Sequence, residues 1–178
     1  MTPEWSRPER LDAIGEGERT VAIEADADER TALARRFGVI AIDRLSARLT
    51  VRAEAGGVLV TGQVTGEVVQ ACSVTDERLT TAVDEPVALR FVPPAEGTDE
   101  VELSADALDT IEIEGSAIDL GEAAAETLAL AIDPFPRGPN AATVLRQAGV
   151  VSEDEARPFN AFSSLKDKLA GKSGPPES

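Results

Sequence analysis

Cys72 is the only cysteine of the chain, and no histidine is present to activate its thiol. Without histidine, a Cys–His or Ser–His pair is impossible, and the usual general base near neutral pH is missing. A zinc site would have to combine one thiolate with carboxylates, which is not a typical set of zinc ligands. The sequence also contains neither a P-loop nor the glycine fingerprint of a dinucleotide-binding fold. We therefore expect no catalytic residue, no metal site and no cofactor, and we interpret Cys72 as a small, half-buried apolar side chain.

Arg44, Arg48 and Arg52 recur at every fourth position and have the chemistry to bind phosphate. On an extended strand their side chains would share one face, with successive members about 13 Å apart. Arg30, Arg35 and Arg36 lie just upstream, so together the six arginines could form a local phosphate-binding patch. The alternative is an ordinary solvated face, softened by nearby glutamates. This arginine row is the first candidate partner-binding surface.

The chain as a whole is strongly acidic, with a formal net charge of −16. Such a long-range field repels nucleic acid, whose binding proteins are normally basic. Between Arg90 and Arg137 the sequence has no lysine or arginine, whereas acidic residues recur. This acidic stretch is the second candidate surface and suits a basic protein, unless its charges are simply solvated. Its candidate residues are Glu100, Glu102, Asp106 and Asp109.

Composition favours a cytoplasmic protein with an aliphatic core. Of the 178 residues, 42% are hydrophobic but only 3% are aromatic, so valine, leucine, isoleucine and alanine must fill the core. No apolar run approaches the roughly 18 residues that identify a membrane-spanning helix. The first residues also lack the apolar segment of a signal peptide. We therefore expect a cytoplasmic location, no contact with membranes and no small-molecule substrate.

A long β-hairpin is the most strongly specified element of the predicted fold. Gly56 and Gly57 would form its two-residue turn, because both can adopt positive φ. If Ala55 pairs with Val58, every pair on one face is apolar or contains glycine: Ala53 with Val60, Val51 with Gly62, Leu49 with Val64, Ala47 with Gly66, and Leu45 with Val68. A slip by one residue would invert this pattern. The inward glycines Gly62 and Gly66 would leave a trough, filled either by a helix of this chain or by a partner segment.

Alternation and capping signals place the other elements around this hairpin. Strands are predicted at residues 5–14, 20–25, 79–91, 100–103 and 110–114. Helices are predicted at residues 27–36, 119–132 and 141–147, with a last one after residue 160. Asp26 and Glu29 resemble a capping box for the first helix, and Gly38 fits its left-handed end. Ser116 and Asp119 would start the second helix in a similar way.

Two blocks of the sequence carry a family resemblance: GQVTGEVVQACSVTDERLTTAVDEPVALRFVPP at residues 62–94 and AIDLGEAAAETLALAIDPFP at residues 117–136. In this order they resemble the bacterial YceD family of large-ribosomal-RNA-subunit accumulation proteins, over residues 7–136. Many relatives have a second cysteine three positions after the first, where this chain has Thr75. The resemblance therefore implies a role in ribosome assembly but no metal site here. The signature residues are Gly62, Gly66, Gln70 and Cys72 in the first block, and Asp119, Leu120 and Glu126 in the second.

These observations predict an α+β fold with a mainly antiparallel curved sheet or partial barrel and helices packed on one side. Residues 1–136 would form the YceD-like domain, 137–170 a helical extension and 171–178 a disordered tail. The resemblance implies a non-enzymatic assembly factor that supports accumulation of large-subunit ribosomal RNA. The alternatives are an acidic escort that binds a basic ribosomal protein without RNA contact, and a carboxylate-based hydrolase. The expected partner is accordingly ribosomal RNA or a basic large-subunit ribosomal protein.

Overall fold

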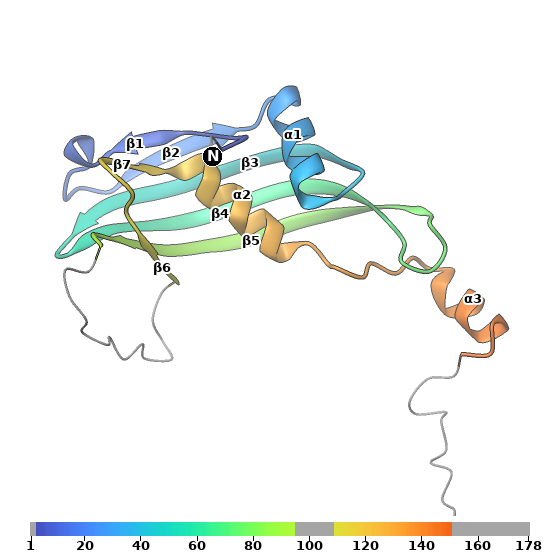
Figure 1. Ribbon diagram of the computed structural model, residues 1–178. Helices are drawn as coiled ribbons and strands as arrows, with labels where there is room; N and C mark the ends of the chain where they lie inside the picture. The colour runs from blue at the N-terminus through green and yellow to red at the C-terminus, as the bar shows by residue number, and fades with distance from the viewer. Residues whose placement is uncertain (1–2, 95–108, 151–178) are drawn as a thin grey trace, which may run out of the picture. The chain divides into compact units, whose positions relative to one another are not determined.

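An open five-stranded sheet forms the centre of the computed structural model, which describes residues 3–94 and 109–150 (Figure 1). In spatial order the strands are β2 (Arg19–Glu24), β3 (Ala41–Glu54), β4 (Gly57–Ala71), β5 (Arg78–Val92) and β6 (Asp109–Glu112). Neighbouring strands are antiparallel, except that β6 runs parallel to β5. The predicted α+β class with a mainly antiparallel sheet is thus confirmed, but the sheet does not close into a barrel.

A short ribbon and the helices complete the described structure. The ribbon pairs β1 (Pro8–Arg10) with β7 (Ala117–Asp119), and a single 3-10 turn, η1 (Leu11–Ala13), follows β1. The helices are α1 (Ala27–Phe37), α2 (Leu120–Ala131) and α3 (Ala141–Gln147). The chain divides into two compact units, Met1–Gly138 and Pro139–Ser178, and α3 belongs to the second. The predicted strand at residues 100–103, the helix after residue 160 and the tail lie outside the described residues.

The first helix, α1, begins and ends where its capping signals predict. The Asp26 carboxylate accepts a hydrogen bond from the Glu29 backbone N–H at 2.9 Å, and the Glu29 carboxylate accepts one from the Asp26 N–H at 2.8 Å. This reciprocal pair is a capping box with aspartate in the first position. Gly38 ends the helix with a φ of 68°, the left-handed conformation that glycine adopts at low cost.

The β3–β4 hairpin forms as predicted, but its register was predicted wrongly by two residues. Glu54 pairs with Gly57, so the turn consists of Ala55 and Gly56, and Val51 faces Val60 instead of Gly62. Only one turn residue, Gly56, has a positive φ, of 89°. Gly57 serves another purpose, because a Cβ there would lie 2.1 Å from the carbonyl oxygen of Phe91. A shift by two keeps the same side chains inward, so alternation alone could not reveal the error.

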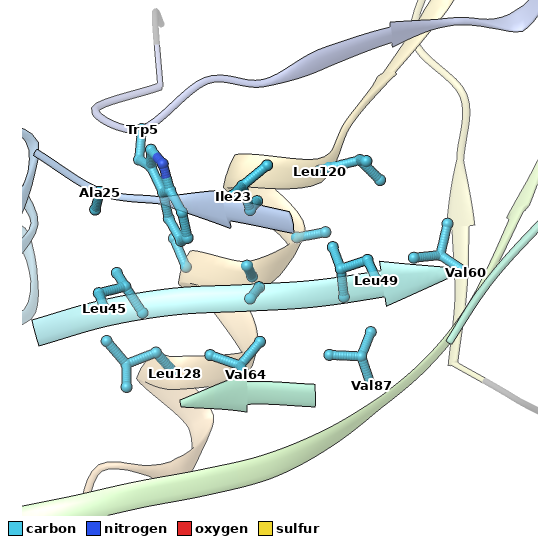
Figure 2. Close-up of a cluster of buried hydrophobic side chains, with 14 of the residues drawn as sticks. Trp5, Ile23, Ala25, Leu45, Leu49, Val60, Val64, Val87, Leu120 and Leu128 are labelled. Atoms are coloured by element: carbon cyan, nitrogen blue, oxygen red, sulfur yellow. The ribbon is translucent and has the colours of Figure 1, made fainter. Parts of the chain in front are cut away.

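One apolar core lies between the sheet and helices α1 and α2 (Figure 2). The inward side chains of β3 and β4, among them Leu45, Leu49 and Val64, meet the buried face of α2. Leu128 of α2 lies directly over Gly66, where an added Cβ would be 3.1 Å from its Cδ1 atom. The trough predicted at Gly66 is therefore filled by a helix of this chain. Gly62 differs, because its φ is 154° and the β3 backbone, not a helix, approaches it.

Two predictions near the ends of the first unit need correction. Residues 5–14 do not form one strand: only Pro8–Arg10 pair, because the partner β7 is itself three residues long, and Trp5 instead lies fully buried in the core. Ser116 does not cap α2. Its carbonyl accepts a hydrogen bond from the Leu11 N–H, and the following residues stay extended to pair with β1, so the helix begins only after Asp119.

Candidate functional site

The family-signature segment Ile118–Glu122 builds the junction between the ribbon and α2. Ile118 and Leu120 are buried in the core, while Asp119 caps the helix. One oxygen of the Asp119 carboxylate accepts hydrogen bonds from the N–H groups of Gly121 and Glu122, and also from the Arg7 N–H at 2.8 Å. A Cβ at Gly121 would lie 2.4 Å from the Trp5 carbonyl oxygen, so the N-terminal segment can approach only a glycine here. This segment therefore acts in folding, and its carboxylate is occupied by structural hydrogen bonds.

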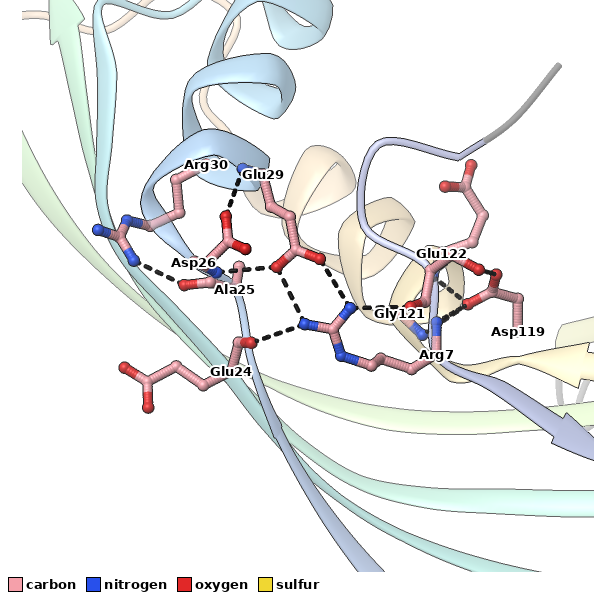
Figure 3. A network of polar contacts seen from close by, with 10 residues as sticks. Arg7, Glu24, Ala25, Asp26, Glu29, Arg30, Asp119, Gly121 and Glu122 are labelled. Atoms are coloured by element: carbon pink, nitrogen blue, oxygen red, sulfur yellow. Dashed lines mark hydrogen bonds and ion pairs between the residues drawn. The ribbon is translucent and has the colours of Figure 1, made fainter.

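Arg7 connects this junction to the start of α1 (Figure 3). Its guanidinium binds both carboxylate oxygens of Glu29, at 2.7 and 3.0 Å, and also donates to the carbonyl oxygen of Glu24 at 3.1 Å. The bidentate hydrogen bonds from Arg7 lower the pKa of the Glu29 carboxyl below its usual value. Because Glu29 also belongs to the capping box, one network fixes the N-termini of both helices. Its charges are satisfied within the protein.

A second arginine, Arg36, joins the two helices. Its guanidinium donates to the Glu122 carboxylate of α2 at 2.7 Å and to the Glu4 carboxylate at 2.9 Å. These hydrogen bonds, chiefly the one to Glu122, raise the pKa of Arg36. Arg36 was predicted to form a phosphate-binding patch together with the arginine row of β3. The structure instead holds it on the helical side of the sheet, engaged with carboxylates.

Cys72 lies in the turn between β4 and β5, next to the segment that follows α2. Its side chain is fully buried, and its sulfur accepts a hydrogen bond from the Gly138 N–H at 3.3 Å. This N–H, the Thr75 hydroxyl and the Val74 N–H lower the pKa of the thiol to about 7, because they stabilise the thiolate. The prediction of a half-buried apolar residue was therefore wrong, since the thiol is buried among polar donors.

The same turn explains the position of Gln70. Its side-chain amide donates to the carbonyl oxygen of Asp133 at 2.8 Å, and the Ser73 N–H donates to the carbonyl of Pro136 at 2.8 Å. Both bonds fasten the chain after α2 to the end of the hairpin. Within residues 3–94 and 109–150, no group of three or more cysteine, aspartate or glutamate side chains is arranged to hold a metal ion. That no metal binds stays a prediction.

The arginine row lies on the face of the sheet opposite the helices, as its alternation with the buried residues of β3 requires. Arg44 and Arg48 are exposed and form no ion pair with any residue of the described part of the chain. Arg52 is half-buried and engaged, at 2.6 Å from Glu54 and 3.4 Å from Glu18. The row therefore offers two uncommitted cations instead of three.

Cross-strand polar pairs occupy much of the remaining face. Ser46 and Thr65 are hydrogen-bonded at 2.9 Å, and Gln63 donates to Asp84 at 2.6 Å. Such cross-strand pairs stabilise an exposed sheet face.

The acidic stretch is described only in part. Glu100, Glu102 and Asp106 lie outside the described residues, whereas Asp109 is the exposed first residue of β6. Glu126, a signature residue, is exposed on α2. Both side chains line a groove between α2 and the β5–β6 edge of the sheet. Both residues were predicted to matter, but not to lie together, and Glu85 and Leu130 of the same groove were not predicted at all.

Comparisons with known proteins agree with the sequence resemblance. No match was found among the curated proteins, and none among the solved structures. Within the described residues, no helix has the length and apolar character needed to cross a bilayer. A family model described as "Large ribosomal RNA subunit accumulation protein YceD" matches residues 60–167, which is more than half of the chain. The chain therefore belongs to the YceD family, whose description links it to accumulation of the large-subunit ribosomal RNA.

Proposed function

We propose that this protein is a non-enzymatic assembly factor of the large ribosomal subunit, which acts in the cytoplasm by binding a component of that subunit. The observation that carries this proposal is the use that the fold makes of the family-signature residues. Gly66 admits Leu128, Gln70 holds the chain after α2, Asp119 caps α2, and Leu120 fills the core. The signature therefore specifies a scaffold and not a catalytic constellation.

The burial of the side chains also favours a binding function over catalysis. No charged side chain of the described residues is buried, and the buried polar side-chain groups are the thiol of Cys72 and the indole N–H of Trp5. Catalytic acids and bases usually have pKa values that burial or neighbouring charges shift strongly toward the working pH. The large pKa shifts among the described residues belong to Arg36, which is held in ion pairs, and to the Cys72 thiol, which is covered by the turn. This favours a binding function over the carboxylate-based hydrolase.

Depletion of the protein in cells that carry it tests the proposal. The ratio of large-subunit to small-subunit ribosomal RNA should fall, and immature large-subunit particles should accumulate in a density gradient. Re-expressed protein should restore the ratio and should co-sediment with these particles at low salt. An unchanged ratio after depletion would contradict the proposal.

A second candidate function, escort of a basic ribosomal protein, is favoured by the groove that Asp109 and Glu126 line. Negative charge around this groove repels phosphate and attracts lysine and arginine. The escort would also serve subunit assembly, since it would deliver or protect a component. The two candidates differ in whether RNA or protein is the direct partner.

A further inference from the structure

A continuous groove runs along α2, between this helix and the β5–β6 edge of the sheet. Two adjoining hollows of about 540 and 410 Å³ form it, and they share Ile111, Ala123 and Glu126. The floor is apolar: Val87, Phe91 and Ile113 are buried beneath it, and Ile111 is half-buried. Each hollow has a volume within the range of typical ligand-binding pockets.

The rim of the groove carries acidic side chains from both walls. The strand wall contributes Glu85, Asp109, Glu112 and Glu114, and the helix wall contributes Glu126 and Glu122. None of the described lining residues is a lysine or arginine. Of these six rim residues, Glu122 alone forms an ion pair with a cation of the described residues, Arg36. Parallel acidic walls over an apolar floor concentrate a negative potential along the groove.

Leu130 gives the groove an apolar contact point at one end. Its side chain is 86% exposed, although Leu120, Ala124 and Leu128 of the same helix are fully buried. A leucine this exposed does not contribute to the core, and beside an apolar hollow it is typical of an interaction site.

We propose that this groove binds a basic segment of a large-subunit ribosomal protein, in which lysine or arginine alternates with apolar side chains. The apolar side chains would pack on Ile111 and Leu130, while the cations would pair with Glu85, Asp109 and Glu126. RNA is not suited to this site, because its phosphates would meet only carboxylates. The inference rests on the proposed function, from which it takes the large subunit as the source of the partner.

Three full-length variants test the groove. The first carries Glu85→Gln, Asp109→Asn and Glu126→Gln. A matched control carries Glu16→Gln, Glu24→Gln and Asp43→Asn, which changes the net charge equally at exposed positions outside the groove. The third variant is Leu130→Ser. Each is titrated, at two salt concentrations, against individually purified basic large-subunit proteins, polylysine and large-subunit ribosomal RNA.

We expect at least one of the basic proteins to bind the wild type. The groove variant should weaken that binding by roughly tenfold, because three ion pairs of ordinary surface strength are lost together. The control should change it by less than about threefold, in line with a weak long-range effect. Leu130→Ser should also weaken it by roughly tenfold, as loss of an apolar anchor does. The affinity for polylysine should not change with Leu130→Ser.

Other results would overturn the inference. Equal weakening by the groove and control variants would mean that net charge alone attracts the protein. No effect of Leu130→Ser would mean that the apolar floor is unused. If the wild type binds RNA and the groove variant does not, RNA is the occupant of the groove. A wild-type dimer that Leu130→Ser dissociates would make a second copy the occupant, and a groove variant with reduced folding stability would indicate a segment of this chain.

The outcomes also separate this inference from the proposed function. If depletion lowers large-subunit RNA but no large-subunit protein binds the wild type, the groove inference fails and the function stands. If depletion leaves the RNA ratio unchanged while a basic protein still binds in the groove, the proposed function fails and the binding site stands.

Discussion

Gly66→Val tests the packing of α2 on the sheet. The φ of Gly66 is not positive, so valine fits the backbone, and its β-propensity would stabilise the strand by up to about 1 kcal/mol. Against this, the new Cβ would lie 3.1 Å from Leu128 Cδ1 and 3.3 Å from the Arg44 carbonyl oxygen. Its two methyl groups would need space that Leu128, fully buried, already fills. Overpacking of this kind costs roughly 1–3 kcal/mol, so we expect net destabilisation.

Urea unfolding measures this change directly, because the only tryptophan, Trp5, is fully buried in the same core (Figure 2). Its fluorescence should report a lower midpoint with an unchanged slope. Leu128→Ala alone should cost roughly 2–5 kcal/mol, since it leaves a cavity. In the double variant valine can occupy that cavity, so the combined cost should be smaller than the sum of the single costs.

Two results would refute the packing argument. If Gly66→Val raises stability, strand propensity outweighs the contact. If the two costs simply add, Leu128 and residue 66 do not compete for the same space. Gly66→Ala is the matched control, because it adds the Cβ without the two methyl groups and should be closer to neutral.

Three further predictions concern the turn, the cap and the arginine row. Cys72→Ser should keep the fold, and wild-type protein purified without chelator should contain no stoichiometric zinc. The folded state lowers the pKa of the Cys72 thiol to about 7. The stability of the wild type should therefore rise with pH from about 7 to 9, and this contribution should be lost as the pH falls through 7. Equilibrium unfolding of the serine variant should lack this pH dependence. Asp119→Ala should destabilise the protein by roughly 0.5–2 kcal/mol, because α2 loses its N-cap. Asp119→Asn should retain most of the stability, and equal losses for both variants in thermal unfolding would count against the cap. If RNA is a direct partner, the triple variant Arg44→Gln, Arg48→Gln and Arg52→Gln should abolish RNA binding and lower the salt slope by about 0.7–0.9 per lost phosphate contact. Amides at the four candidate acidic positions should leave RNA binding unchanged or strengthen it. Unchanged RNA titrations of the arginine variant would rule the arginine row out.

Local signals predicted elements well where the cause of the structure is itself local. The capping box of α1 involves Asp26 and Glu29, three positions apart, and its geometry is set by the helix alone. The hairpin register failed because Gly57 was assigned to the turn. Its real constraint is the close backbone of Phe91 on β5, a contact that no pattern within the hairpin encodes. The predicted range of α2, residues 119–132, agrees with the structure. Only the capping role of Ser116 was wrong, because its carbonyl is engaged by Leu11 from the distant N-terminal segment.

For the candidate site, too, local patterns predicted what depends on neighbouring residues and missed what depends on distant ones. Alternation correctly placed Arg44 and Arg48 on the exposed face, but it could not show that Arg52 is held by Glu18 and Glu54. The groove along α2 was missed, since its walls come from elements separated in the sequence. One signal was available: Leu130 falls off the apolar line of α2, so helical periodicity marks it as an apolar residue facing away from the core.

The β1–β7 ribbon bears on the order in which the protein folds. Strands β2 to β5 each pair with the next strand along the chain, so they can assemble as the chain is synthesised. The Arg7 N–H and its acceptor Asp119 are instead 112 residues apart. The N-terminal segment must therefore wait until α2 has been made, with Trp5 unburied in the meantime. Closure of this ribbon should be the last folding step, and the Arg7 and Leu120 amides should exchange hydrogen earlier than those of β4; equal protection would show that the unit closes all at once.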